Sequence, residues 1–161
     1  MKLRYCMECG APLASRAATE YVCAHGHEYW NEPHGSVCVA VLRDGQVLLA
    51  RRGIEPLKDK YVLPGGFVEF DETPYDAARR EMREETGLDC PELELLEVHT
   101  VHYRENEASL SIVFHAPGWQ GEPRAGDDAA ALEWRPVDAV ESDEFAWHIP
   151  GLAAKLRRLT G

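Results

Sequence analysis

Three glutamates stand close together in one segment of the sequence, at positions 81, 84 and 85. In a helix of about 3.6 residues per turn, this spacing gathers Glu81, Glu84 and Glu85 within an arc of roughly 100°. Three like charges this close repel one another, and a bound divalent cation relieves the repulsion because hard cations such as Mg²⁺ take oxygen ligands. The spacing therefore predicts a metal site on one face of a helix.

The residues around these glutamates predict a helix over 74–86. Thr73 suits the N-cap, Pro74 fits the first helical position, and Gly87 suits the left-handed residue that follows a helix. A solvated charged helix is the alternative. That alternative does not explain why three acids gather beside an apolar stripe, or why a Pro-Gly-Gly loop at 64–66 precedes them.

The segment 66–88 has nine positions that fit a known pattern, namely Gly66, Glu72, Arg80, Glu81, Met82, Glu84, Glu85, Gly87 and Leu88. It resembles the Nudix box, G-x5-E-x7-R-E-U-x-E-E-x-G-U, where U is apolar. The likeness extends more loosely over about residues 35–150. The resemblance implies a Nudix-type α/β/α sandwich with a mixed sheet, and a hydrolase of nucleoside diphosphates linked to another moiety.

Carried over by position, the resemblance also implies roles for single residues. Glu81, Glu84 and Glu85 would bind Mg²⁺ or Mn²⁺, with the backbone carbonyl of Gly65 completing the ligand set. Arg80 would orient Glu84, and Arg80, Glu81 and Glu84 would carry the catalysis. Divalent ions suit this reaction because they bridge phosphate oxygens and lower the pKa of a bound water.

Other candidate residues lie outside the box. Glu133, just before Trp134, falls where some family members place an additional metal-binding or catalytic glutamate; a surface acid at the end of a strand is the alternative. Arg51 and Arg52 end a predicted strand near the glycine loop, where guanidinium groups can clamp phosphates. Tyr103 falls close to the position at which diadenosine polyphosphate hydrolases carry a tyrosine. It is a third candidate for substrate binding.

Residues 1–30 contain a second set of metal-ligand candidates. Cys6 and Cys9 form a C-x2-C pair, and Cys23-Ala-His25-Gly-His27 follows. Three thiolates and one imidazole complete a tetrahedral Zn²⁺ site, with His25 favoured as the fourth ligand and His27 as the alternative. The segment resembles the zinc ribbon of some Nudix enzymes, including NADH pyrophosphatases. A ribbon that has lost its metal, or a hairpin with a disulfide, is the other interpretation.

The favoured substrate is ADP-ribose, NADH or a similar nucleoside diphosphate derivative, cleaved to a nucleoside monophosphate and a phosphorylated partner. The ribbon favours dinucleotides, but residues 89–103 contain no Ser-Gln-Pro-Trp-Pro-Phe-Pro run, which NADH pyrophosphatases carry. The proline that ADP-ribose enzymes typically carry about fifteen residues past the box is also missing. Two alternatives remain: a nucleoside triphosphate pyrophosphohydrolase that clears modified nucleotides, and a non-catalytic metabolite-sensing module.

The rest of the chain predicts an α/β domain over 31–161 behind a ribbon-like segment over 1–30. Strands are expected at 37–43, 47–51, 93–103, 110–116 and 132–136, with a closing helix after Pro150. The net charge of −11 argues against a general nucleic-acid-binding surface. The longest apolar run, 37–42, is far shorter than a membrane span. With no apolar leader at the start of the sequence, we expect a cytoplasmic protein, and family resemblance makes a homodimer possible.

Overall fold

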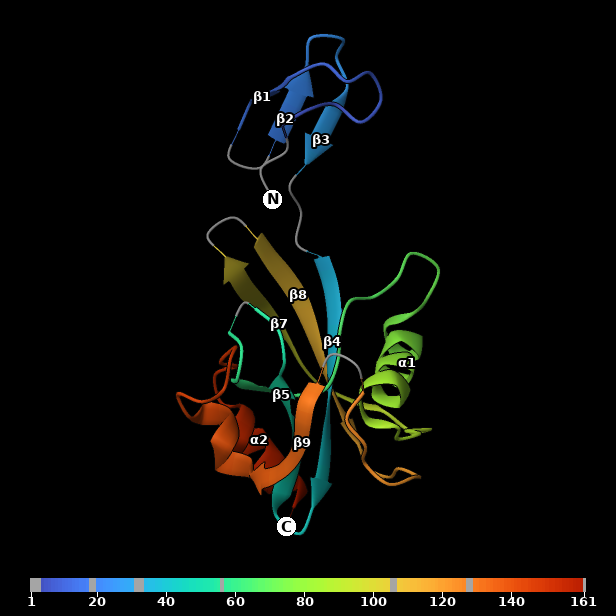
Figure 1. The fold of residues 1–161 in the computed structure, drawn as a ribbon, viewed down its shortest axis with the longest axis vertical. Coiled ribbons are helices and arrows are strands. Elements are labelled where there is room, and N and C mark those ends of the chain that lie inside the picture. The colour runs from blue at the N-terminus through green and yellow to red at the C-terminus, as the bar shows by residue number, and fades with distance from the viewer. Residues whose placement is uncertain are drawn as a thin grey trace.

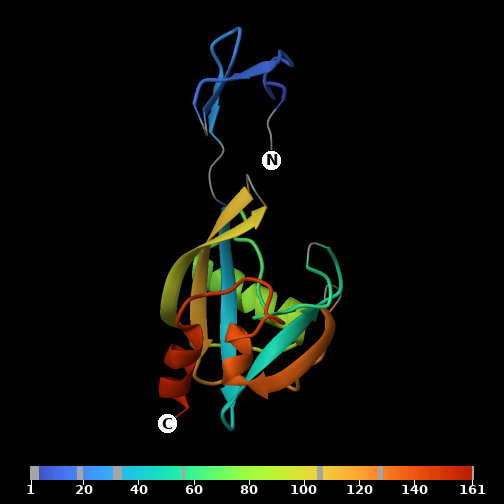
Figure 2. The ribbon, with the colours of Figure 1, turned by 90° about the vertical axis from the view of Figure 1, so that its left-hand side faces the viewer.

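The computed structural model describes residues 4–17, 20–30, 34–55, 57–104, 107–126 and 129–160, without the side chains of residues 103, 104 and 107. Its first unit is a three-stranded antiparallel sheet of β1 (Leu13–Ser15), β2 (Glu20–Cys23) and β3 (Glu28–Trp30). Figures 1 and 2 draw this sheet at one end of the molecule. The predicted boundary between residues 30 and 31 adjoins residues 31–33, which lie outside the described residues, so the division into two domains stays a prediction.

A six-stranded mixed sheet forms the main body. Its strands are β4 (His34–Arg43), β5 (Gln46–Arg52), β6 (Tyr61–Val62), β7 (Glu94–Arg104), β8 (Glu107–Ala116) and β9 (Ala129–Pro136). The order is β6-β5-β4-β8-β7, with β9 paired to β5; β4 and β8 run parallel and the other pairs antiparallel. Strands β4, β8 and β9 begin three residues earlier than predicted, because cross-strand pairing continues into their less apolar first residues.

Helices cover both faces of this sheet (Figures 1 and 2). Helix α1 (Pro74–Thr86) packs on one face, and the 3₁₀ helix η1 (Val137–Glu141) and helix α2 (Leu152–Leu159) pack on the other. Alternate residues of β4 point to opposite faces, so Val39 joins the α1 core while Ala40 joins the α2 core. The predicted α/β/α sandwich is confirmed. Within the described part of the chain, no helix has the length and apolarity needed to cross a bilayer.

The hairpin of β4 and β5 opens beyond its turn. The two strands pair at Leu42–Val47 and Arg43–Gln46, and residues 64–68 then occupy the edge of β4. Along that edge, Val39 donates to the carbonyl of Pro64 and Val37 to the carbonyl of Gly66, both at 2.9 Å. Gly65 has a φ of 150° there, and a Cβ on it would overlap the carbonyl of Val37. The glycine loop is therefore held against β4, between that strand and α1.

Candidate metal and substrate site

Local interactions fix both ends of the helix that carries the glutamates. The Thr73 side chain accepts a hydrogen bond from the backbone N–H of Asp76 at 3.2 Å. At the other end, Gly87 has a φ of 71° and donates to the carbonyl of Arg83 at 3.0 Å. The predicted bounds, 74–86, are confirmed. Glu81, Glu84 and Glu85 therefore lie in the last two turns.

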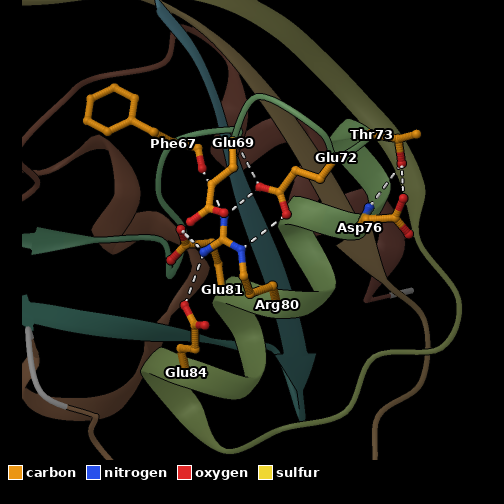
Figure 3. Close-up of polar contacts among 8 residues, drawn as sticks. All are labelled: Phe67, Glu69, Glu72, Thr73, Asp76, Arg80, Glu81 and Glu84. Atoms are coloured by element: carbon orange, nitrogen blue, oxygen red, sulfur yellow. Dashed lines mark hydrogen bonds and ion pairs between the residues drawn. The ribbon is translucent and has the colours of Figure 1, made fainter.

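Arg80 is the centre of a network of acidic side chains, drawn in Figure 3. Its guanidinium binds Glu72 through two hydrogen bonds, Nε to Oε2 at 3.1 Å and Nη2 to Oε1 at 2.6 Å. Its Nη1 donates to Glu81 Oε1 at 2.7 Å and to Glu84 Oε2 at 3.0 Å, and its Nη2 also donates to the carbonyl of Phe67 at 3.0 Å. The predicted Arg80–Glu84 pair is present, and the same arginine holds two further carboxylates.

These contacts determine the charge of the network. The hydrogen bonds from Arg80 lower the pKa of the Glu72 carboxyl, and those same bonds raise the pKa of Arg80. Burial raises the pKa of Glu81, and the neighbouring guanidinium opposes that rise. Arg80 thus stabilises negative charge on acids that would otherwise repel one another.

The glycine loop holds the remaining acid. The backbone N–H of Gly65 donates to Glu85 Oε2 at 2.8 Å. A Cβ on Gly66 would overlap the carboxylate of Glu81 and displace it, so a glycine here leaves that carboxylate in place. The predicted metal-binding role of the Gly65 carbonyl stays a prediction.

The side chains present fit a hard divalent cation. Glu81, Glu84 and Glu85 offer only oxygen atoms, the ligands that Mg²⁺ and Mn²⁺ prefer. The side chain of Glu84 is 60% exposed, so its carboxylate is open to an ion from solvent. Because Gly66 has no side chain, the loop backbone next to the Glu81 carboxylate does not cover it.

A cavity of about 460 Å³ opens beside these carboxylates and has a volume suited to a small-molecule ligand. It brings together five predicted residues: Gly65, Glu81, Glu85, Arg51 and Arg52. The Nε of Arg51 is buried and has no hydrogen-bond partner among the described residues. The guanidinium of Arg52 lies 4.5 Å from the ring centroid of Trp147. The two arginines thus form part of a wall shared with the carboxylates.

Several residues of the cavity wall were not predicted as site residues. Cys38 of β4, Ser111 of β8 and Ile54 line the cavity. Phe145 and Trp147 line it as well, and the sequence offers one signal for them, a pair of aromatics close together before the last helix. The others carry no local signal, because strand pairing across the fold brings them to the cavity.

Glu133 makes its described polar contacts with residues other than the predicted catalytic ones. It lies on β9 opposite Leu49, whose side chain belongs to the α2 core. Its carboxylate accepts a hydrogen bond from the hydroxyl of Tyr61 at 2.9 Å and lies 3.6 Å from the guanidinium of Arg135. It is not among the residues that line the 460 Å³ cavity. Tyr103 lies on β7, but its side chain is outside the described part of the structure.

The predicted zinc ligands meet at the small N-terminal sheet. Ligand atoms of Cys6, Cys9, Cys23 and His27 all lie within 4.8 Å of one another. The Nδ1 of His27 is 3.2 Å from Cys6 Sγ, while the Nδ1 of His25 is 3.2 Å from Cys9 Sγ. This arrangement favours His27, the alternative ligand, over His25. Three sulfur atoms and one imidazole nitrogen are the donor set of a structural zinc site.

The thiol chemistry of this cluster also suits a metal. All five cysteines are free, including Cys9 and Cys23, whose sulfur atoms lie 3.8 Å apart. Burial alone would raise the pKa of Cys6, but hydrogen bonds from the Tyr29 hydroxyl and the backbone N–H of Cys9 bring it down to about 6. A thiolate at neutral pH is the form that binds a metal.

Comparison with known proteins places this fold and site in one class. Residues 32–156 match the NUDIX domain, so the chain belongs to the Nudix family. It is similar to the ADP-ribose pyrophosphatase of Methanocaldococcus jannaschii, with 40% identity over 104 residues; the match covers 63% of this chain and 62% of that protein.

Two further relatives extend the comparison. The 8-oxo-dGTP diphosphatase of Escherichia coli (strain K12) is 28% identical over 127 residues, which cover 76% of this chain and 96% of that protein. The crystal structure of a MutT NUDIX hydrolase from Burkholderia pseudomallei superimposes with a TM-score of 0.67 at 28% identity, over 78% of this chain and 97% of that one. The chain therefore shares both the fold and the sequence pattern of the Nudix family.

Proposed function

We propose that this protein hydrolyses the pyrophosphate bond of nucleoside diphosphate derivatives such as ADP-ribose or NADH. The products are a nucleoside monophosphate and a phosphorylated partner. One observation carries the proposal: Glu81 and Glu85 line the same cavity as Arg51 and Arg52. Similarity to an ADP-ribose pyrophosphatase supports the same substrate class.

The acidic residues act in this proposal as ligands of Mg²⁺ or Mn²⁺. Bound ions of this kind bridge phosphate oxygens and lower the pKa of a water molecule. Glu81, Glu84 and Glu85 would hold them, because Glu81 and Glu85 line the cavity and Arg80 bonds to both Glu81 and Glu84. Arg80 keeps Glu81 and Glu84 on one side of the helix through its Nη1, and the N–H of Gly65 holds Glu85.

Two arginines that line the same cavity would bind the substrate. Arg51 has an unused, buried Nε donor, and Arg52 lies above Trp147. Guanidinium groups bind phosphate oxygens strongly, so these two residues would hold the diphosphate while the aromatic and aliphatic lining takes the nucleoside. Tyr103 stays a predicted contact of the substrate.

A triphosphate substrate is the second candidate. Similarity to an 8-oxo-dGTP diphosphatase, over 96% of that protein, favours a nucleoside triphosphate pyrophosphohydrolase. The products distinguish the two reactions. A diphosphate derivative yields a nucleoside monophosphate and a phosphorylated partner, whereas a triphosphate yields inorganic pyrophosphate.

The test is a product assay on ADP-ribose, NADH and nucleoside triphosphates with Mg²⁺ or Mn²⁺, resolved by ion-exchange chromatography. We expect hydrolysis of a diphosphate derivative by the wild type, and loss of turnover in Glu84→Gln with an unchanged circular dichroism spectrum. Glu92→Gln, which changes an exposed glutamate beyond the helix, is the matched control. If the wild type hydrolyses none of these compounds with either metal, the proposal fails and a metabolite-sensing module is favoured.

Glu133 is proposed as an additional catalytic group, and the same assay tests it. A base or metal ligand at this position predicts that Glu133→Gln loses turnover on the scale of Glu84→Gln. Its contacts with Tyr61 and Arg135 instead predict a small loss, because those contacts already engage the carboxylate with side chains of β6 and β9. Comparing kcat of Glu133→Gln and Glu84→Gln decides between these roles.

We also propose that residues 1–30 form a zinc-binding unit ahead of a Nudix domain over 31–161. Cys6, Cys9 and Cys23 would bind a structural Zn²⁺ with His27 as the fourth ligand. The cytoplasmic location and the homodimer stay predictions. A small nucleotide is the proposed partner, and the net charge of −11 favours no general nucleic-acid binding.

A further inference from the structure

The C-terminal end of α1 is bonded to a loop that precedes β9. The last four carbonyls of a helix have no partner within it and need one elsewhere. Here the N–H of Gly126 donates to the carbonyl of Glu85 at 2.9 Å, and the N–H of Arg124 donates to the carbonyl of Thr86 at 2.8 Å. The backbone of one site glutamate, Glu85, and of its neighbour Thr86 is therefore bonded to this loop.

Gly126 makes the closest of these approaches. A Cβ on Gly126 would overlap the carbonyl oxygen of Glu84 and would lie 3.1 Å from the Cα of Glu85. Both of these atoms belong to the helix backbone, which cannot turn aside as the end of a flexible side chain can. Gly126 is not among the glycines with positive φ, so an alanine there meets a steric obstacle and no backbone penalty.

The loop is anchored at both of its ends. Asp89 and Gln120 exchange two backbone hydrogen bonds, at 3.0 and 2.9 Å, just beyond α1. At the other end, the N–H of Ala129, a residue that lines the cavity, donates to the carbonyl of Gly126 at 3.2 Å. The loop thus connects the end of the glutamate helix to Ala129, which also lines the cavity.

We infer that Gly126 is a positioning residue for the metal-binding carboxylates. Glu85 is held at two points, at its carbonyl by Gly126 and at its carboxylate by the N–H of Gly65. A Cβ at position 126 would displace the backbone of Glu84 and Glu85 and so move both of their side chains. Glu81, one turn earlier, would stay in place. The inference rests on the proposed function insofar as these carboxylates bind the metal.

The test compares Gly126→Ala with Gly118→Ala in the full-length chain. A Cβ on Gly118 would meet nothing within 4 Å, so this substitution in the same connection is the matched control. Binding of Mn²⁺ is titrated by electron paramagnetic resonance without substrate, and the Mg²⁺ dependence of hydrolysis is measured separately. For Gly126→Ala we expect the Kd for Mn²⁺ and the Mg²⁺ concentration for half-activation to rise about 10- to 100-fold. Saturating metal restores most of kcat, and Gly118→Ala behaves as wild type.

A purely structural role predicts a different result. If Gly126→Ala lowers the melting temperature but binds Mn²⁺ with the wild-type Kd, the inference is overturned. If Gly126→Ala does not fold, Arg124→Pro removes the N–H that bonds to Thr86 without adding bulk beside Glu84, and an unchanged Kd for Mn²⁺ in that variant overturns the inference as well. Failure of the proposed function is distinguishable, because the wild type then hydrolyses no substrate while the Mn²⁺ titration still reports on the carboxylates.

Discussion

One arginine holds most of the acidic side chains of this site in place. Arg80 reaches Glu72, Glu81 and Glu84 at once, and also binds the carbonyl of Phe67 in the glycine loop. A guanidinium can do this because its five N–H groups point outward in one plane. Glu72, which lies outside the helix, thereby becomes part of the support of the metal ligands.

Arg80→Lys should lower activity although the positive charge is kept. An ammonium group is a compact charge that cannot form the two parallel bonds to Glu72 while also reaching Glu81 and Glu84. We expect kcat to fall about 10- to 100-fold, the usual cost of removing a group that orients metal ligands. Steady-state kinetics at saturating Mg²⁺ measure this loss.

Arg79→Lys is the control for that substitution. Arg79 lies on the same helix but bonds to the carbonyl of Pro91 and pairs with Asp76, away from the glutamates. Its replacement should leave kcat close to the wild-type value. Equal activity of the Arg80→Lys and wild-type proteins would mean that the network does not position the ligands.

The helix and the small N-terminal sheet are stabilised in different ways. Helix α1 begins at a side-chain cap, ends at a left-handed glycine, and buries Ala77, Ala78 and Met82 against the sheet. The small N-terminal sheet has short strands, and its buried residues include two of the cysteines that form the metal cluster. One element is therefore stabilised by packing, and the other is expected to depend on a metal.

Thr73→Ala should destabilise the protein with little effect on chemistry. The substitution removes the oxygen that accepts the N–H of Asp76, and such caps contribute about 1 kcal/mol. Urea denaturation followed by circular dichroism measures the free energy of unfolding. Thr160→Ala at the end of α2 changes an exposed hydroxyl that only donates to Arg157, and its effect should stay within about 0.5 kcal/mol. Equal effects of the two substitutions would argue against the cap.

His27→Ala should remove zinc from the N-terminal unit. His27 belongs to the group whose ligand atoms lie within 4.8 Å, so its loss leaves three thiolates and a weaker site. We expect one equivalent of zinc in the wild type and in His25→Ala, and much less in His27→Ala, by elemental analysis after dialysis. The opposite order would restore His25 as the ligand, and no zinc in the wild type would rule out the site.

At the scale of the whole molecule, the cavity results from the opening of the β4–β5 hairpin. Because β5 leaves β4 beyond the Leu42–Val47 pair, the glycine loop can bond to β4 in its place. Two hydrophobic cores, one under each helix, stabilise this split sheet. With a net charge of −11, the molecule as a whole repels anionic substrates, so arginines and metal ions must reverse the field inside the cavity.

The local sequence was sufficient to predict the helix and the strands of the core. Thr73, Pro74 and Gly87 act on their own neighbours, so the bounds of the helix followed from sequence and are confirmed. The starts of β8 and β9 did not, because distant strands extend them: Ala129 of β9 pairs with Arg52. The family pattern predicted the contact of Arg80 with Glu84 for the same local reason, since the two residues lie one turn apart.

Site residues that are distant in sequence and meet only in the fold could not be predicted from the sequence. Cys38 and Ser111 meet at the cavity only because β4 and β8 pair in parallel. Gly126 carries no motif, and its role depends on where a loop returns to α1. The choice between His25 and His27 likewise depends on the turn between β2 and β3, which spacing alone does not specify.

The most direct test of this account is a crystal of the wild-type protein soaked in Mn²⁺, with anomalous diffraction used to locate the ions. The account predicts manganese bound to the carboxylates of Glu81, Glu84 and Glu85 at the edge of the cavity. Manganese bound elsewhere, with these three side chains directed away from one another, would contradict it.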